Sequence, residues 1–327
     1  MRMQGAGVER NRLGQWLLAC LWLSANVTWA STAPPHDYYV LSPEPLSGPV
    51  SVMSLEPGNT ITAGSSQVTL QQYETASIPA AAFTSGTKFS GTGFFTAGSN
   101  QNAADLLVPD DFAGTAFVIP HIAGSHRYFF LSPVGNAEVT IRIGATTAVI
   151  TANQGVVNEF DAGSDNTQAG RITSTLPIVV THTAYLDGVA RDAYPVPPAA
   201  TDMLGVRSQN TVIAALNSGT SVTVYASDAT SSTYTLAAGE QVTVTNGLNS
   251  AQGLGSALHV VASGPVAAVE YDDGDGNDST AFWSAASLGT RHGIPVNAQY
   301  LAVACNQPGV TLTLYKGRNA PETQSCS

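Results

Sequence analysis

The sequence contains little charge of either sign and almost no lysine. Charged side chains make up 11% of the 327 residues, and acidic residues outnumber basic ones by 23 to 12. The lysines are Lys88 and Lys316. Nucleic-acid interfaces depend on Lys and Arg clustered opposite phosphates, so we expect no nucleic-acid partner.

Long hydrophobic runs are absent beyond the first 30 residues. Residues 13–29 form an apolar segment that follows three arginines and ends before Ala30. This pattern is typical of a cleaved secretory signal peptide over residues 1–30. A Leu-Leu-Ala-Cys sequence ending at Cys20 offers the alternative of a lipoprotein anchor, although the apolar run continues past it. We expect a secreted, periplasmic or cell-surface protein without a transmembrane segment.

Cysteine is scarce. With Cys20 in the signal segment, Cys305 and Cys326 remain as a pair, and in an oxidising compartment we expect them to form a disulfide. On the chain-entropy model, closing a loop of roughly 20 residues contributes about 3 kcal/mol. The bond would hold a short tail that has little core of its own.

Helical periodicity is nearly absent. Instead, β-branched and polar residues alternate, as in Ser-Val-Thr-Val-Tyr at 221–225 and Gln-Val-Thr-Val-Thr at 241–245, between clusters of Gly, Asn and Ser. Such alternation indicates half-buried antiparallel strands. The sequence therefore predicts an all-β protein.

One pattern recurs four times along the chain, at a spacing of 83 to 90 residues. Each copy has an apolar strand, headed by Tyr38, Tyr128, Val212 or Tyr300, followed by a Val-rich strand. Units of this length can each bury a small core, so we predict tandem β-sandwich-like repeats, with the blades of one β-propeller as the alternative. The predicted boundaries are a signal peptide at 1–30, β units at 31–119, 120–205 and 206–295, and a terminal hairpin with the disulfide at 296–327.

The second and third units agree over most of their length, whereas the first is the most degenerate. Prolines before Ile178 and Val266 occupy matching places, and we expect them at a strand start or edge, where a missing N–H donor is harmless. An aspartate recurs at the links between units, at Asp105, Asp192 and Asp278. A shared turn explains a residue repeated in every unit better than catalysis does.

The densest carboxylate cluster lies at residues 272–278. There, side-chain oxygens recur at alternate positions, the spacing with which calcium-binding loops surround one ion, and the candidate ligands are Asp273, Asp275, Asn277 and Asp278. The twelfth position of such a loop is Ser284 rather than the usual Glu. Calcium is the one cofactor that the sequence suggests.

Motifs of known chemistry are missing. The sequence has no His-Glu-x-x-His and no Gly-x-Ser-x-Gly, and His121 and His126 lie five residues apart without a metal-binding pattern, so we expect neither zinc nor a catalytic centre. The rival hypothesis is a secreted hydrolase whose acid and base come from four aspartates of the second and third units. These are Asp187, Asp192, Asp273 and Asp275.

Aromatic residues are few, at 8% of the chain. Most head strands and are expected in the core. Trp283, which follows the acidic cluster and is flanked by polar turns, is the best candidate for an exposed binding residue, with Phe282 beside it and Tyr194 in a proline-rich link as further candidates.

The order of these features resembles a known family. A Tyr-headed strand, a Val-Thr-Ile strand, the turn Leu-Ala-Ala-Gly-Glu at 236–240, a proline-containing strand and the linking aspartate together resemble the N-terminal domain family of the IgGFc-binding protein, over roughly residues 100–315. The resemblance implies an extracellular binding or adhesive module without a catalytic centre. It does not imply antibody binding, because no residue set for that activity can be transferred.

The sequence thus favours a secreted or cell-surface binding and adhesion protein that displays loops from repeated β units. Its expected partner is an extracellular protein or glycan. Besides the hydrolase, the alternative is a structural subunit of a surface layer or filament that assembles by self-association.

Overall fold

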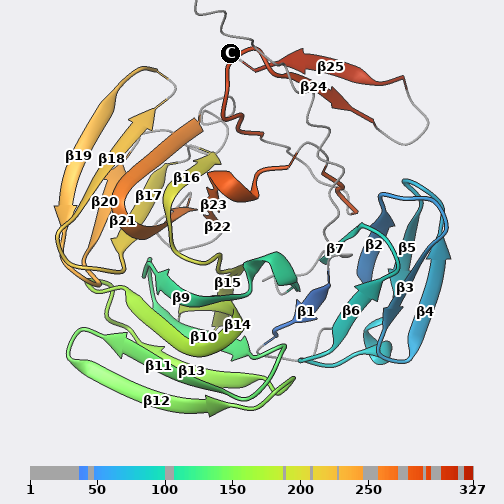
Figure 1. The fold of residues 1–327 in the computed structure, drawn as a ribbon, viewed down its shortest axis with the longest axis horizontal. Helices are drawn as coiled ribbons and strands as arrows, with labels where there is room; N and C mark the ends of the chain where they lie inside the picture. The colour runs from blue at the N-terminus through green and yellow to red at the C-terminus, as the bar shows by residue number, and fades with distance from the viewer. Residues whose placement is uncertain are drawn as a thin grey trace, which may run out of the picture. The chain divides into compact units, whose positions relative to one another are not determined.

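The computed structural model describes residues 37–42, 48–99, 107–186, 189–206, 209–226, 228–245, 257–271, 279–289, 292–295, 303–315 and 320–326. Within these ranges the regular elements are 25 β-strands and three short 3-10 helices (Figure 1). Every strand pairing is antiparallel. The predicted all-β class with repeated sheets is confirmed, and the described residues fall within one compact unit, Pro34–Ser327.

Module 2, as we call β9–β15, shows the repeating plan most clearly. Its long strand β14 takes part in two sheets. The first part of β14 pairs with β11 and β9, and the last part pairs with β10 and β15. With their outer neighbours these pairings give the strand orders β12-β11-β14-β9 and β13-β10-β14-β15. The strands are β9 (Gly114–Ile119), β10 (Ser125–Leu131), β11 (Ala137–Ile143), β12 (Thr146–Ala152), β13 (Asn158–Gly163), β14 (Gly170–Leu186) and β15 (Val189–Pro195).

Module 3, which comprises β16–β23, repeats this plan. Its long strand β21 pairs first with β18 and β16 and then with β17 and β22, and β23 adds to the free side of β16. The short helix η3 (Ala285–Ser287) follows β23. The strands are β16 (Ala200–Val206), β17 (Asn210–Ala215), β18 (Thr220–Ala226), β19 (Ser231–Leu236), β20 (Gln241–Thr245), β21 (Ala257–Tyr271), β22 (Thr280–Ala281) and β23 (Trp283–Ser284).

Module 1, which comprises β1–β8, follows the plan with its long strand broken in two. β6 pairs with β3 and β1, and β7 pairs with β2. Together, β6 and β7 occupy the place that β14 has in module 2. The 3-10 helices η1 (Ala80–Ala82) and η2 (Asp110–Phe112) lie between and after its strands. The strands are β1 (Tyr38–Val40), β2 (Val50–Ser54), β3 (Asn59–Ala63), β4 (Ser66–Leu70), β5 (Thr75–Ile78), β6 (Lys88–Gly91), β7 (Phe95–Ser99) and β8 (Leu107–Pro109).

This topology corrects the predicted alignment of the first repeat. The strand at Tyr38 pairs with β6 and β8, as β16 pairs with β21 and β23. The strand at Tyr128 instead pairs with β13 and β14, and its counterpart in module 1 is β2, which pairs with β5 and β7. The Tyr-headed segments are alike because both need a buried, apolar strand, and local sequence does not distinguish the two positions.

The module boundaries also shift. The β9 strand pairs with β14 and the β16 strand with β21, so module 2 begins at residue 114 rather than 120 and module 3 at 200 rather than 206. Each module encloses an apolar cluster between its two sheets, because inward side chains alternate with outward ones along the strands, and the cluster of module 2 also includes one residue each from β21 and β22 of module 3. In β11, for example, Val139 and Ile141 are fully buried while Glu138 and Arg142 are exposed.

The matching prolines lie inside the long strands rather than at their ends. In β14, pairing with β11 ends at Ser174 and pairing with β10 begins at Val179, so Pro177 lies where the strand crosses between the two sheets. Pairing of β21 with β18 ends at Ala262 and pairing with β17 begins at Val266, so Pro265 takes the same place. The missing N–H falls in a gap of both ladders, which explains why proline is tolerated there.

Neighbouring modules share buried surfaces. Between modules 1 and 2, Tyr39 and Val108 pack with Phe129 and Leu131. Between modules 2 and 3, Val118 packs with Ala214 and Ala267, and the N–H of Ala169 donates to the carbonyl of Gly239 at 2.8 Å. In both junctions the sheet that contains β1 or β9 faces the sheet that contains β10 or β17 of the next module.

The C-terminal part contains a hairpin of β24 (Thr311–Leu314) and β25 (Glu322–Ser325). The predicted Cys305–Cys326 disulfide is present. Tyr315, just after β24, stacks on Tyr73 of module 1 with ring centroids 6.3 Å apart. The predicted strand at Tyr300 lies outside the described residues.

Candidate functional site

Of the three aromatic residues predicted to bind, Trp283 alone reaches the surface. Its side chain is 39% exposed and stands edge-on to Phe112 of η2, with ring centroids 5.1 Å apart. Phe282 and Tyr194 are each about 1% exposed, and we correct their assignment from binding to core residues. Phe282 fills the space over Gly205, where a β-carbon would lie 2.2 Å from its ring.

The acidic segment lies outside the described residues. The predicted calcium ligands therefore have no described position; they are Asp273, Asp275, Asn277 and Asp278. Asp105, one of the linking aspartates, also lies outside the described residues. Asp192 lies in β15, where its backbone pairs with Ala184 of β14, but its side chain is not described. The calcium site, the shared turn and the hydrolase hypothesis therefore stay predictions.

The outer face of the first sheet of module 3 carries a row of side chains around Trp283 that are exposed except for Leu204, which is 7% exposed. Strand register places Trp283 opposite Leu204, Leu204 opposite His259, and His259 opposite Tyr225. Residues in register point to the same side of a sheet, so these four share one face. Tyr225 is 46% exposed, and its ring lies 6.1 Å from that of His259. Residues one position along, such as Met203, point into the core instead.

A second row on the same face contains Asp202 and Val261. The Nε2 atom of His259 lies 2.7 Å from Oδ1 of Asp202, and both side chains are about half exposed. Val261 is 37% exposed. We call the set of Trp283, Leu204, His259, Tyr225, Asp202 and Val261 the module 3 platform.

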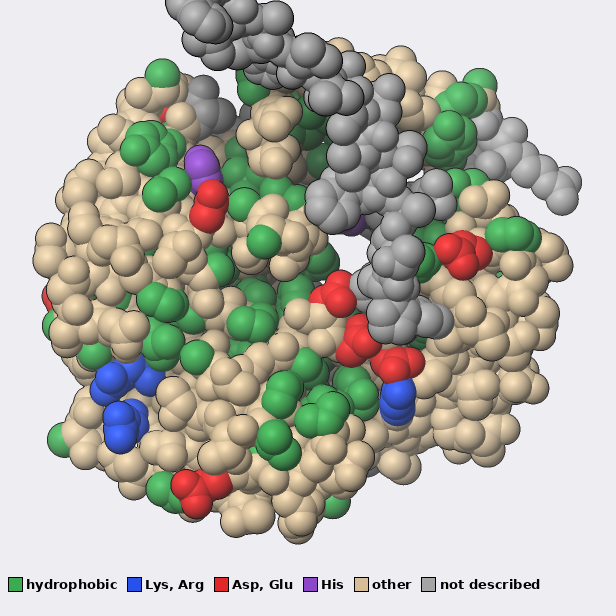
Figure 2. Space-filling model, in the orientation of Figure 1, with side chains coloured by type: hydrophobic (Ala, Val, Ile, Leu, Met, Phe, Trp, Pro, Cys, Tyr) green, Lys and Arg blue, Asp and Glu red, His purple; other side chains and the backbone are tan. Residues whose placement is uncertain are grey.

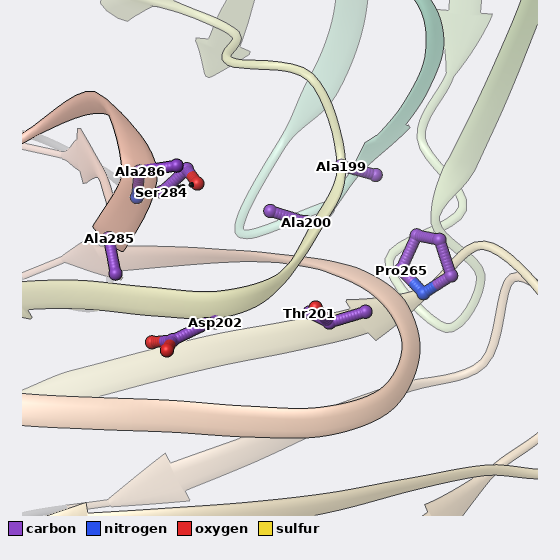
Figure 3. Close-up of a pocket in the computed structure, with 8 residues that line it drawn as sticks. All are labelled: Ala199, Ala200, Thr201, Asp202, Pro265, Ser284, Ala285 and Ala286. Carbon is purple, nitrogen blue, oxygen red and sulfur yellow. Dashed lines mark hydrogen bonds between the residues drawn. The ribbon is translucent and has the colours of Figure 1, made fainter.

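An open cavity of about 410 Å³ adjoins the platform at Asp202 (Figure 3). Its wall is formed by residues 199–202, Pro265 and residues 284–286. In Figure 3, the start of β16 runs between η3 and Pro265. The Ser284 hydroxyl accepts a hydrogen bond from the N–H of Ala286, which leaves its own proton available to donate. The lining thus combines one carboxylate with hydroxyl groups and small apolar side chains.

The structure also reveals a buried histidine cluster that the sequence did not predict. His121, His126 and His182 are each no more than 1% exposed. The His121 and His126 rings stack at 4.0 Å, and those of His126 and His182 at 5.1 Å. The ring of Tyr194 stands edge-on to His182 at 5.0 Å.

Hydrogen bonds fix the tautomer of each ring. His121 Nδ1 lies 2.6 Å from the carbonyl of Asp165 and must donate to it, so Nε2 accepts from the hydroxyl of Tyr128. The Asn166 amide is satisfied when its nitrogen faces His126 Nε2, at 2.6 Å. His126 Nδ1 then donates to Nε2 of His182 at 3.0 Å. All three imidazoles are neutral in this arrangement.

Burial explains why the rings stay neutral. It lowers the pKa of His121 to about 3 and lowers the pKa of His126 below its usual value. It takes the pKa of His182 well below the normal range, and the neighbouring imidazoles act in the same direction. A proton added to one ring would place a charge in a buried space, where it loses most of the hydration that stabilises it in solvent.

The cluster is tied to the junction between modules 2 and 3. The side chain of Gln241 in β20 accepts from the N–H of His121 at 3.0 Å and donates to the carbonyls of His121 and Asn166, both at 2.8 Å. One glutamine of module 3 thereby holds two segments of module 2. The signal available in the sequence was His126 and His182 alternating with apolar residues in two strands, which indicates inward-facing rings.

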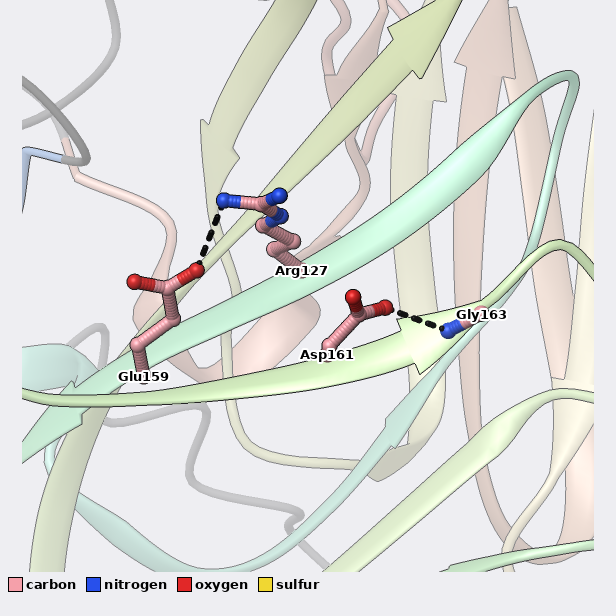
Figure 4. A network of polar contacts seen from close by, with 4 residues as sticks. All are labelled: Arg127, Glu159, Asp161 and Gly163. Carbon is pink, nitrogen blue, oxygen red and sulfur yellow. Dashed lines mark hydrogen bonds and ion pairs between the residues drawn. The ribbon is translucent and has the colours of Figure 1, made fainter. Parts of the chain in front are cut away.

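Carboxylates on β13 of module 2 make local contacts (Figure 4). Glu159 accepts from Arg127 at 2.8 Å, and Asp161 accepts from the N–H of Gly163 at 2.9 Å.

Among the described residues, no group of three or more His, Cys, Asp and Glu side chains is arranged to hold a metal ion. No described helix is long and apolar enough to cross a membrane.

Charged side chains on the molecular face drawn in Figure 2 stand singly or in small groups among neutral atoms.

Comparison with protein-family models and with curated proteins finds no match to this chain. The resemblance to the IgGFc-binding protein family therefore remains a prediction from short motifs.

Proposed function

We propose that this chain is a secreted or cell-surface binding and adhesion protein, without a catalytic centre, that presents surfaces and loops from rigidly joined β modules. Its partner is an extracellular protein or glycan. The signal peptide over residues 1–30 would direct its export. The resemblance to an extracellular binding family agrees with this proposal.

The observation that supports it best is the way the modules are joined. Modules 1, 2 and 3 share one topology, and each junction buries apolar side chains contributed by both neighbours. The contacts of Gln241 add side-chain hydrogen bonds to the second junction. Equivalent loops are thus held at fixed spacing, which favours multivalent contacts.

Binding of residues 31–327 to arrays of glycans, mucins and matrix proteins tests the proposal. We expect binding to at least one class of surface ligand. The experiment is run once with calcium and once with a chelator. Binding that is lost with the chelator is assigned to the predicted calcium loop at 272–278, and binding that remains is assigned to the rest of the protein. Absence of binding in both arms contradicts the proposal.

The sheet edges favour self-association as a second candidate function. In the described strand orders, β4, β12 and β19 each end a sheet, and none of them contains a charged residue. Uncharged edge strands are open to pairing with another chain. Light scattering that rises with concentration, with ordered polymers in electron micrographs, would support a structural subunit; a monomer at all concentrations would exclude it.

A further inference from the structure

We propose that the module 3 platform forms a binding site for a neutral sugar unit of an extracellular glycan. This inference rests on the proposed binding function and names its ligand class. It assigns stacking to Trp283 and Tyr225, and hydroxyl recognition to Asp202.

The aromatic part of the site suits the apolar faces of sugar rings. Trp283 and Tyr225 belong to β23 and β18, with β16 and β21 between them. At about 4.8 Å per strand, their backbones lie about 14 Å apart, with Leu204 and His259 between them on the same face. The exposed members of this row, Trp283, His259 and Tyr225, can contact neighbouring rings of one sugar chain. Aromatic side chains also provide a large contact area at little cost in conformational entropy.

The polar part of the site is centred on Asp202. Its Oδ1 is held by His259, while Oδ2 has no hydrogen-bond partner among the described residues. Asp202 also lines the cavity, alongside Thr201 and Ser284. A carboxylate accepts hydrogen bonds from the hydroxyl groups of a sugar, whereas Thr201 and Ser284 lie one position away from platform residues and face the other side of the sheet. Residues that are two apart in paired strands lie about 7–8 Å away from each other, so Asp202 and Trp283 can contact adjoining parts of one ligand.

Charge favours a neutral ligand over an anionic one. The platform and the cavity wall contain Asp202 but no Lys or Arg. A phosphate or sulfate group would meet a carboxylate without a fixed cation to offset it. We therefore expect polyanionic glycans to bind more weakly than neutral ones.

Most side chains of the module 3 platform are exposed, whereas the matching strands of the earlier modules are covered. The corresponding strands of modules 1 and 2, β1 with β8 and β9, pack against the next module through Tyr39, Val108 and Val118. In module 2 the positions that match Tyr225 and His259 are Arg142 and Arg171, which also pair across β11 and β14. The aromatic row is therefore specific to module 3.

The test measures binding of residues 31–327 to neutral hexose oligosaccharides, N-acetylhexosamine oligosaccharides and sulfated glycans by calorimetry. The variants are Asp202→Asn, Tyr225→Ala and Trp283→Ala, and the matched control is Arg142→Ala in module 2. Thermal unfolding checks each fold, since Trp283 also packs on Phe112, whereas Asp202 and Tyr225 are about half exposed. We expect a neutral sugar to bind, with affinity falling roughly tenfold or more in each platform variant and little changed in the control.

Three results would overturn the inference. These are sugar binding that survives all three platform substitutions, binding restricted to sulfated glycans, and binding to proteins with none to neutral sugars. The last result is compatible with the proposed binding function, whereas the absence of binding to every glycan and protein would contradict both the sugar site and the proposed function.

Discussion

The Nδ1 atom of His126 lies 3.0 Å from Nε2 of His182, and both rings are fully buried. In the neutral arrangement, His182 Nδ1 carries a proton that has no hydrogen-bond partner among the described residues. The cluster is thus stable as long as it is uncharged, and its contacts with the Gln241-bound segment make the module junction depend on that state.

We predict that the folded protein loses stability as the pH falls below about 6.5. The unfolded histidines have a pKa near 6.5, whereas burial lowers the folded pKa of His121 to about 3 and those of His126 and His182 below their usual values. The unfolded state therefore binds more protons between these limits, and stability falls with pH across that window. At pH 5 the loss should be about 2 kcal/mol for His121, and His126 and His182 should add to it in the same direction.

Urea denaturation at pH 7.5, 6.5 and 5.0 measures this loss. The matched variant is His259→Gln, because His259 is exposed and outside the cluster. It should retain the pH dependence, whereas His182→Phe should weaken it. A free energy of unfolding that is constant from pH 7.5 to 5.0 would contradict the buried neutral cluster.

The histidine cluster also shows what the sequence could not provide. His126 and His182 are 56 residues apart and meet because β10 and β14 pair with a particular register, Tyr128 opposite His182. Alternation predicted the strands, and the repeat predicted that modules 2 and 3 match. Register between distant strands depends on packing across both sheets, which no local pattern records.

The predicted alignment of the first repeat was wrong for a related reason. Tyr38 and Tyr128 head similar apolar strands, but β1 lies beside β6 and β8 while β10 lies beside β13 and β14. Propensity describes a buried strand and not its neighbours. The disulfide was predictable because Cys305 and Cys326 were the last two cysteines left, whereas the burial of Phe282 depended on the space over Gly205.

We predict that Gly205→Ala destabilises module 3. The new β-carbon would lie 2.2 Å from Cδ1 of Phe282, a ring that is about 1% exposed. Overpacking of this kind costs about 1–3 kcal/mol. Gly135→Ala is the control, since its nearest neighbour is the flexible end of Leu176 at 3.1 Å. Equal midpoints in urea for the two variants would show that Phe282 can move aside.

We predict that Gln241→Ala weakens the junction between modules 2 and 3. The substitution removes three hydrogen bonds to the backbone of His121 and Asn166. Buried backbone groups left unpaired cost about 1–3 kcal/mol each, although water reaching the partly buried site would reduce the total. Gln154→Ala, which removes an exposed bond to the carbonyl of Pro133, should cost far less. Chemical denaturation compares the two, and equal losses would mean that Gln241 does not hold the junction.

We predict that the disulfide stabilises the C-terminal hairpin without holding the modules together. The bond joins Cys305 to Cys326, and the backbone of Cys326 pairs with Gly309 and Val310 beside the hairpin. The double variant Cys305→Ser, Cys326→Ser should lose about 3 kcal/mol of local protection, because the open loop regains its conformational freedom. Hydrogen exchange should then be faster in β24 and β25, while β11 and β14 of module 2 keep their rates because Val139, Ile141 and Ile172 are buried in a separate core. If β11 and β14 also exchange faster, the hairpin contributes to the fold of the whole unit, and the contact between Tyr315 and Tyr73 becomes the path by which it does so.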